Sequence, residues 1–205
     1  MAQRSAYVKN AERPYKFNKN MKTFKTEYIE DIKPKLQKKF GIKNAFALPH
    51  IEKAIINVGV GEAVSNKKAI AHVQEQLERI SGQKTVVTVA RKSIATYKIR
   101  KGQPIGVKVT LRGKNMYYFI EKLVRVVLPR LRDFRGIKDT CVDKHGNLNI
   151  GFTEQTIFPE IEYDKIDKIR GLEVTIVTSS KNREHGRELF SMLGIPFASD
   201  APKKI

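Results

Sequence analysis

The spacing of apolar residues along the chain predicts four helices. In each of them, apolar side chains recur three or four residues apart and therefore share one face. The four segments are residues 27–40, 65–80, 115–131 and 183–193. Within the first, Pro34 predicts a kink or a later helix start, because proline lacks the backbone donor of a regular turn. Ser65 is the expected N-cap of the second.

Alternating apolar and polar positions predict four strands, at residues 51–59, 85–90, 106–112 and 172–179. The order of elements is strand, helix, strand, strand, helix, then a later strand and helix. This order predicts an α+β fold with a mostly antiparallel sheet on a split βαβ-like core. We expect the helices to pack on one face of the sheet and the other face to stay open and polar.

The polar side of two predicted strands is rich in hydrogen-bond donors. At 51–59 and 106–112 the residues that oppose the apolar ones are Lys53, Asn57, Lys108, Thr110 and Arg112. A one-sided sheet with a solvated face would show the same alternation. The donors come with few acids, however, and such a set suits phosphate, 2′-hydroxyl and base-edge contacts.

The charge of the chain supports a nucleic-acid partner. Its 205 residues include 40 Lys and Arg but 21 Asp and Glu, which gives a net charge of +19. A compact fold with this surplus repels itself unless a polyanion neutralises it. No apolar stretch approaches the roughly 18 residues that a membrane span needs. We therefore expect a nucleic acid and no membrane.

The loop at 90–105 is the strongest local signal. Loops longer than about 12–15 residues are usually functional or disordered. This one is strongly basic, and it includes an aromatic ring that can stack on a base. We predict that it contacts RNA and that it is mobile in the free protein. Its candidate contact residues are Arg91, Lys92, Ser93, Tyr97, Lys98, Arg100 and Lys101.

Nothing in the sequence forms a catalytic or metal-binding constellation. The segment at 59–64 is similar to a dinucleotide fingerprint, but Val64 stands where the third glycine is required. Cys141 is the one cysteine, so neither an intramolecular disulfide nor a thiolate zinc cluster can form. We interpret the acids Glu160, Glu162, Asp164 and Asp167 as a solvated segment. We therefore predict no enzymatic activity, cofactor, metal or small-molecule substrate.

Six motifs resemble one known family. They are IEKAIINVGVGEA at 51–63, ISGQK at 80–84, ARKS at 90–93, PIGVKVTLRG at 104–113, PRLRDFRG at 129–136 and FPEI at 158–161. From about residue 25 to residue 197 the chain resembles the bacterial form of large-subunit ribosomal protein five. The resemblance implies a structural protein of the central protuberance that binds 5S rRNA and large-subunit rRNA. It also implies contacts with peptidyl-site tRNA and with small-subunit ribosomal protein thirteen.

The resemblance assigns roles to individual positions. Lys53, Asn57, Gln83 and Thr110 match family positions associated with 5S rRNA, and the loop at 90–105 matches the tRNA-facing loop. The segment around 133–163 matches the intersubunit side, with Asp133, Arg135, Asp143, Glu160 and Tyr163 as candidate contacts.

The chain divides into a basic arm at 1–25, one RNA-binding domain at 26–198 and a short tail at 199–205. The family usually starts near Met21, so the arm has no inherited role. A transit peptide has a similar composition, but we interpret the segment as an arm of the mature protein. We expect a cytoplasmic, ribosome-bound protein, with an organellar ribosome as the alternative location.

Two other functions fit parts of the pattern. A free-standing RNA-recognition module shares the βαββαβ order, but the strand at 106–112 has no aromatic ring for it. A nucleotide-dependent enzyme would need the missing glycine and catalytic groups.

Overall fold

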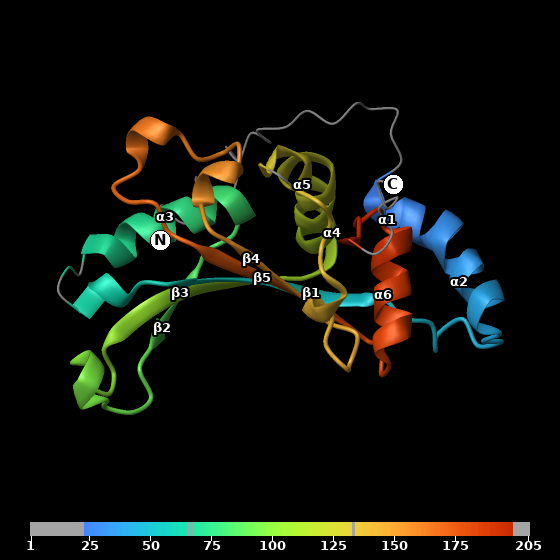
Figure 1. Cartoon of the computed structure of the whole chain (residues 1–205), viewed down its shortest axis with the longest axis horizontal. Helices are drawn as coiled ribbons and strands as arrows, with labels where there is room; N and C mark the ends of the chain where they lie inside the picture. Colours follow the sequence, from blue (N-terminus) through green and yellow to red (C-terminus); the bar gives the residue numbers. More distant parts are fainter. Residues whose placement is uncertain (1–22, 65, 67, 133, 199–205) are drawn as a thin grey trace, which may run out of the picture.

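The computed structural model describes residues 23–64, 66, 68–132 and 134–198 (Figure 1). Among them, five strands form one sheet in the order β2-β3-β1-β5-β4, with antiparallel pairing throughout. The strands are β1 (Ile51–Gly59), β2 (Val86–Val89), β3 (Pro104–Leu111), β4 (Leu148–Phe152) and β5 (Leu172–Thr178). Both β1 and β2 pair with β3, which lies between them, so the predicted split βαβ core is confirmed.

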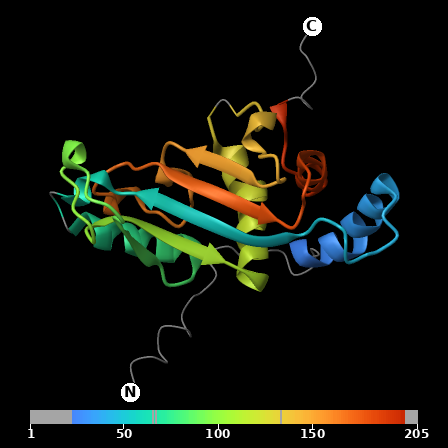
Figure 2. The same cartoon turned by 90° about the horizontal axis from the view of Figure 1, so that it is seen from below.

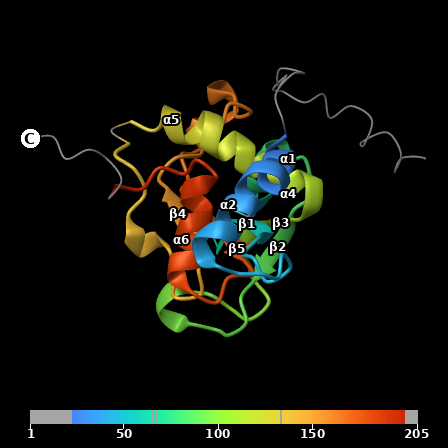
Figure 3. The ribbon, with the colours of Figure 1, turned by 90° about the vertical axis from the view of Figure 1, so that its right-hand side faces the viewer.

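The helices cover one face of this sheet and one end of it. They are α1 (Phe24–Glu27), α2 (Lys33–Phe40), α3 (Lys68–Ser81), α4 (Gly113–Lys122), α5 (Leu128–Arg130) and α6 (Arg183–Met192). α3, α4 and α5 lie over the sheet in Figure 1, and the view from below in Figure 2 shows the strands uncovered. α1, α2 and α6 gather at one end (Figure 3), opposite the loop at 90–105.

Alternation along the strands separates the core from the open face as predicted. The helix-covered side of the three central strands is apolar and buried, and it joins the helices in one core. Its residues include Ala54, Ile56, Val58, Val107, Val109, Leu111, Val174 and Ile176.

Two prolines inside predicted helices each follow a π-helical turn. The turns Tyr28–Ile32 and Leu123–Val127 end two residues before Pro34 and Pro129. A proline cannot donate a backbone hydrogen bond, and its ring crowds the carbonyl four residues earlier. The wider turn moves the bonding partner one residue back, as in the bond from Lys33 N to the Tyr28 carbonyl. The predicted kink at Pro34 is therefore a π turn, and the helical segment continues through it.

The sequence pattern does not predict β4. The alternation of Leu148, Ile150 and Phe152 is short and interrupted by Gly151, which weakens a strand signal. Pairing with the central strand β5 supplies the backbone partners that make this edge segment a strand.

Several predicted features lie outside the described residues, namely residues 1–22 of the arm, Ser65 and the tail. At the start of α3, Asn66 Oδ1 accepts a hydrogen bond from Lys68 N (3.1 Å). Thr23 caps α1, and Phe24 is buried against the guanidinium of Arg125, 5.5 Å from its ring centroid. The folded domain therefore includes residues before 26.

Candidate nucleic-acid interface

The open face of the sheet aligns polar side chains in rows across the strands. Lys108 on β3 lies opposite Asn57 on β1, and Asn57 lies opposite Glu173 on β5. All three are exposed. Directly opposed residues have Cβ atoms about 4.5–5.5 Å apart, so Lys108 and Asn57 belong to one patch. Val86 on the edge strand β2 extends this row beside Lys108.

A second row adds hydroxyl and amide groups. Thr110 and Thr175 lie opposite Ile55 from its two neighbouring strands, and Asn149 on β4 lies opposite Thr175. The hydroxyl of Thr175 donates to Asn149 Oδ1 (2.8 Å). Each row therefore offers polar groups across several strands without a helix above them (Figure 2).

Gln83, Lys53 and Arg112 frame these rows. Gln83 follows α3, and its Nε2 donates to the backbone carbonyl of Thr110 (3.2 Å), which fixes the side chain at the edge of β3. Arg112 directly follows β3 and is exposed, and Lys53 on β1 is half-buried. The six residues predicted from alternation and resemblance to bind 5S rRNA are thus brought together on one face and its rim. Glu173 is an acid on the same face.

The loop at 90–105, here called the basic finger, is a hydrogen-bonded hairpin. Two backbone hydrogen bonds join Ile94 and Ile99 (2.9 and 3.1 Å), and Ala90 N donates to the carbonyl of Gln103 (2.9 Å). The tip between them is the 3-10 turn Ala95–Tyr97. The finger therefore has internal bonds that the sequence does not predict, while its mobility in the free protein stays a prediction.

The finger presents its cations outward. Ser93 Oγ accepts a hydrogen bond from Lys101 N (3.0 Å), and the ring of Tyr97 is 69% exposed. The other predicted contact residues, Arg91, Lys92, Lys98, Arg100 and Lys101, are exposed as well. A ring among five cations on a projecting hairpin is suited to a phosphate backbone or a base face.

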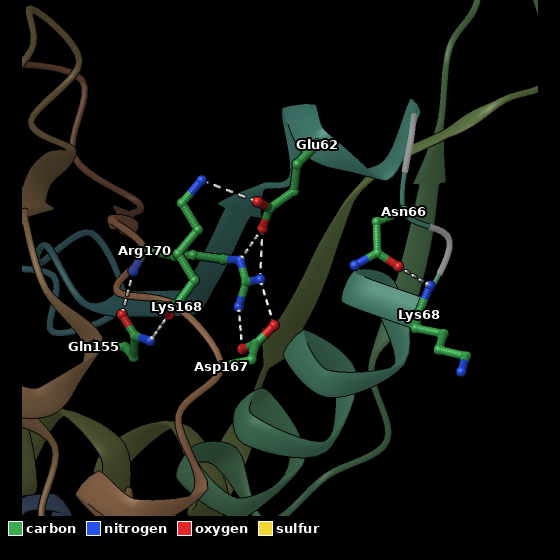
Figure 4. Close-up of polar contacts among 7 residues, drawn as sticks. All are labelled: Glu62, Asn66, Lys68, Gln155, Asp167, Lys168 and Arg170. Carbon is green, nitrogen blue, oxygen red and sulfur yellow. Dashed lines mark hydrogen bonds and ion pairs between the residues drawn. The ribbon is translucent and has the colours of Figure 1, made fainter.

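A network of polar contacts surrounds the buried side chain of Arg170 (Figure 4). Glu62, in the turn after β1, accepts from Arg170 Nε (2.7 Å) and from Lys168 Nζ (3.0 Å). Two further bonds of 2.7 Å join Arg170 to Asp167. Gln155 donates to the Lys168 carbonyl (2.7 Å), which ties a third segment into the network. The sequence pattern does not indicate the pairing of Glu62 with Arg170, because the two lie more than 100 positions apart.

The charges of this network shift one another's pKa values. Hydrogen bonds from Arg170 lower the pKa of Asp167 to about 2. Hydrogen bonds from Lys168 and Arg170 lower the pKa of Glu62. The turn after β1 is also bonded to the finger, since Val60 N donates to the Ile105 carbonyl (2.9 Å). The network therefore joins residues 155–170 to the end of the sheet from which the finger projects.

The predicted intersubunit residues differ in exposure. Arg135 is exposed and Tyr163 is 75% exposed, whereas Asp133 lies outside the described residues. Asp143 is half-buried and accepts three bonds of 2.8 Å within its own turn, from His145 N and from the backbone and side chain of Asn147. These bonds to its ionised form lower its pKa and give Asp143 a role in shaping its turn.

Glu160 is buried, so the interpretation of its acidic segment as solvated is wrong for this residue. Its side chain is 6% exposed and lies 2.6 Å from Lys122 Nζ, which also donates to the Ile80 carbonyl (2.6 Å). The rings of Phe119 and Phe158 flank the ammonium group at 5.7 and 5.9 Å. Burial lowers the pKa of Lys122, and the Glu160 carboxylate opposes this shift.

Other kinds of site find no support among the described residues. There, no group of three or more His, Cys, Asp or Glu side chains could hold a metal ion, and no helix is long and apolar enough to span a bilayer. The glycine segment after β1 leads into the 3-10 turn Gly61–Val64, and α3 begins only at Lys68. A dinucleotide fingerprint would open the helix directly.

Comparison with known proteins identifies the family. The profile of ribosomal protein L5 matches residues 44–100, and the profile of the C-terminus of the same ribosomal family matches residues 104–197. The chain belongs to the ribosomal protein L5 family. The large ribosomal subunit protein uL5 of Desulfatibacillum aliphaticivorans is 54% identical over 177 residues, which are 86% of this chain and 99% of that protein. The uL5 protein of Dictyoglomus thermophilum is 52% identical, over 86% of this chain and 99% of that protein. The uL5 protein of Brevibacillus brevis is 54% identical, over 84% of this chain and 96% of that protein.

Membership of the L5 family fixes the general role of the chain. It is a structural ribosomal protein of the large subunit, and the resemblance seen in its motifs is confirmed. The two matched L5 segments contain the open sheet face, most of the basic finger and the Arg170 network.

Proposed function

We propose that this L5-family chain binds 5S rRNA through its open sheet face, contacts peptidyl-site tRNA through the basic finger and bridges to the small subunit. The observation that carries the proposal is the open face itself. It displays Lys108, Asn57 and Thr110 on adjacent strands, with no helix over them (Figure 2).

The chemistry of the face favours RNA recognised by hydrogen bonds and charge. Gln83 and Asn57 offer amide donors and acceptors, Thr110 offers a hydroxyl, and Lys108 and Arg112 offer cations. These groups suit 2′-hydroxyls and phosphates, which a folded RNA presents on its surface. The rows described above hold no aromatic ring for base stacking, unlike the sheet of an RNA-recognition module. The face is therefore better suited to a structured RNA than to a flexible single strand.

The basic finger is suited to a partner that changes from one encounter to the next. Its exposed cations and Tyr97 can reach a backbone and an outer base, and neither contact depends on sequence. All tRNAs share their backbone and overall shape, so one finger can serve every tRNA in the peptidyl site.

The side formed by residues 133–167 is suited to a protein partner. Tyr163 stands 75% exposed between the exposed acids Glu162 and Asp164. Acids repel phosphate, so we assign this side to a basic protein, small-subunit ribosomal protein thirteen. The buried Lys122–Glu160 pair joins this segment to α4. Cross-links from Tyr163 to rRNA alone would contradict the assignment.

The bacterial relatives support a cytoplasmic ribosome as the place of action. The experiment that tests the central proposal is filter binding of 5S rRNA by the Asn57→Ala and Thr110→Val variants. Each change removes one hydrogen-bonding group, and should weaken binding by roughly 0.5–1.5 kcal/mol. Both variants should keep the wild-type melting temperature, because they leave the buried face untouched. Wild-type affinity in both folded variants would refute the proposal.

A further inference from the structure

The turn between α2 and β1 exposes an unusual side chain. Phe46 is 91% exposed, whereas every other described phenylalanine is buried or half-buried. A large apolar ring left in water forgoes the stabilisation that burial would give it. The turn lies at the end of the sheet opposite the basic finger (Figures 2 and 3).

Hydrogen bonds on both sides of Phe46 fix its outward position. Asn44 Oδ1 accepts from Phe46 N (2.9 Å), and the Asn44 carbonyl accepts from Ala47 N (3.1 Å). Gln37 on α2 donates to the carbonyl of Lys43 (3.2 Å). The residues that follow, Leu48 and Pro49, are buried. The turn is therefore tied down before and after the ring, which it holds away from the core.

The surroundings of the ring are cationic. Lys33 Nζ lies 5.7 Å from the centroid of the Phe46 ring, and residues 32–51 contain five lysines and no acid. One of the five, Lys39, is paired with Glu188 of α6. Lys35 and Lys38 on α2 and Lys43 in the turn are exposed as well.

We propose that Phe46 stacks on an unpaired base of 5S rRNA while Lys33 and Lys43 contact the adjacent phosphates. An exposed ring among cations matches the composition of surfaces that bind unpaired nucleotides. The turn leads directly into β1, whose polar side begins near Lys53. The proposal requires an RNA bound to the open face to extend past the end of the sheet at which this turn lies. This inference rests on the proposed binding of 5S rRNA to that face.

Filter binding of 5S rRNA to the full chain tests the inference. Phe46→Ala should weaken binding by about five-fold or more, the size of the loss of one stacked base. Phe46→Trp should bind as well as the wild type, because another aromatic ring can stack. Ile169→Ala, which removes another exposed apolar side chain (49% exposed) from a different part of the molecule, should change nothing. All three variants should have the melting temperature of the wild type, because the substituted side chains lie outside the core.

Failure of this inference can be told apart from failure of the proposed function. If Asn57→Ala and Thr110→Val weaken binding but Phe46→Ala does not, the open face binds 5S rRNA and the inference is wrong. A photo-crosslinking side chain at position 46 in assembled large subunits should react with 5S rRNA. Reaction with a protein or with other rRNA instead would overturn the inference.

Discussion

The side-chain amide of Gln83 donates a hydrogen bond to the backbone carbonyl of Thr110, across 3.2 Å. The bond joins the segment after α3 to the edge of β3, so the rim of the open face is held in place before RNA arrives. The second amide hydrogen and the carbonyl oxygen of Gln83 remain able to bond with an RNA.

Replacing Gln83 with alanine should weaken 5S rRNA binding by about 2- to 12-fold, which corresponds to roughly 0.5–1.5 kcal/mol for one hydrogen-bonding group. The melting temperature should change little, because the side chain is exposed. Gln74→Ala, on α3 and behind the sheet, is the matched control and should bind normally. Equal losses in both variants would mean that the effect is not local to the rim.

Salt should weaken 5S rRNA binding steeply, because each neutralised phosphate releases counterions. The logarithm of affinity should fall linearly with the logarithm of salt concentration, by about 0.7–0.9 per phosphate contact. Lys108→Gln or Arg112→Gln should each make this slope shallower by about one contact. Lys68→Gln, an exposed change on α3, should leave it unaltered. A flat salt profile for the wild type would show that charge contributes little.

Removing Arg170 should destabilise the fold. Arg170→Leu leaves Glu62 and Asp167 without their shared partner, and lost hydrogen bonds to charged groups cost roughly 1.5–3 kcal/mol. Urea unfolding measures the change in free energy of unfolding. Arg79→Leu breaks exposed pairs with Glu75 and Glu162 and should cost less than about 1 kcal/mol. Similar costs for the two variants would show that the burial of Arg170 adds nothing to the stability of its ion pairs.

Acid should weaken the same network. The pKa of Asp167 is lowered to about 2 in the folded protein from an ordinary value of 3.8. The stabilisation from its ionised form is therefore complete above about pH 4, and is lost as the pH falls from there towards 2. Asp167→Asn should lose stability at neutral pH, and should show a shallower decline of the free energy of unfolding between pH 4 and pH 2. If the free energy of unfolding of this variant declines as steeply as that of the wild type, groups other than Asp167 cause the loss of stability in acid.

The sequence predicts those features of the molecule that depend on the local periodicity of apolar and polar residues. Alternation at Asn57 and Thr110 predicts the open face correctly, because side-chain direction in a strand depends only on position along it. The Lys122–Glu160 and Glu62–Arg170 pairs could not be predicted, because each joins positions that tertiary packing alone brings together. A lysine on the buried side of α4 is the one local hint of such a partner, since buried charges require one.

Shortening the basic finger should separate the contact with tRNA from the binding of 5S rRNA. The base of the finger is joined to the turn after β1 by the bond from Val60 N to the Ile105 carbonyl, and its two arms are joined by the bond from Ala90 N to the Gln103 carbonyl. The residues beyond that base are mostly exposed, and none of them belongs to the core of the described chain. Replacing residues 93–101 with a short Gly-Ser link therefore removes the tip without disturbing the open face.

The shortened protein should bind 5S rRNA and join large subunits as the wild type does, with an unchanged melting temperature. Occupancy of the peptidyl site should fall to a similar extent for every tRNA tested, because backbone and shape are common to all of them. A milder variant, Tyr97→Ala, keeps the cations and separates stacking from charge. If stacking matters, it should lose part of the tRNA affinity without a change in salt slope. Loss of 5S rRNA binding with intact tRNA occupancy would show that the finger and the sheet have been assigned each other's partners.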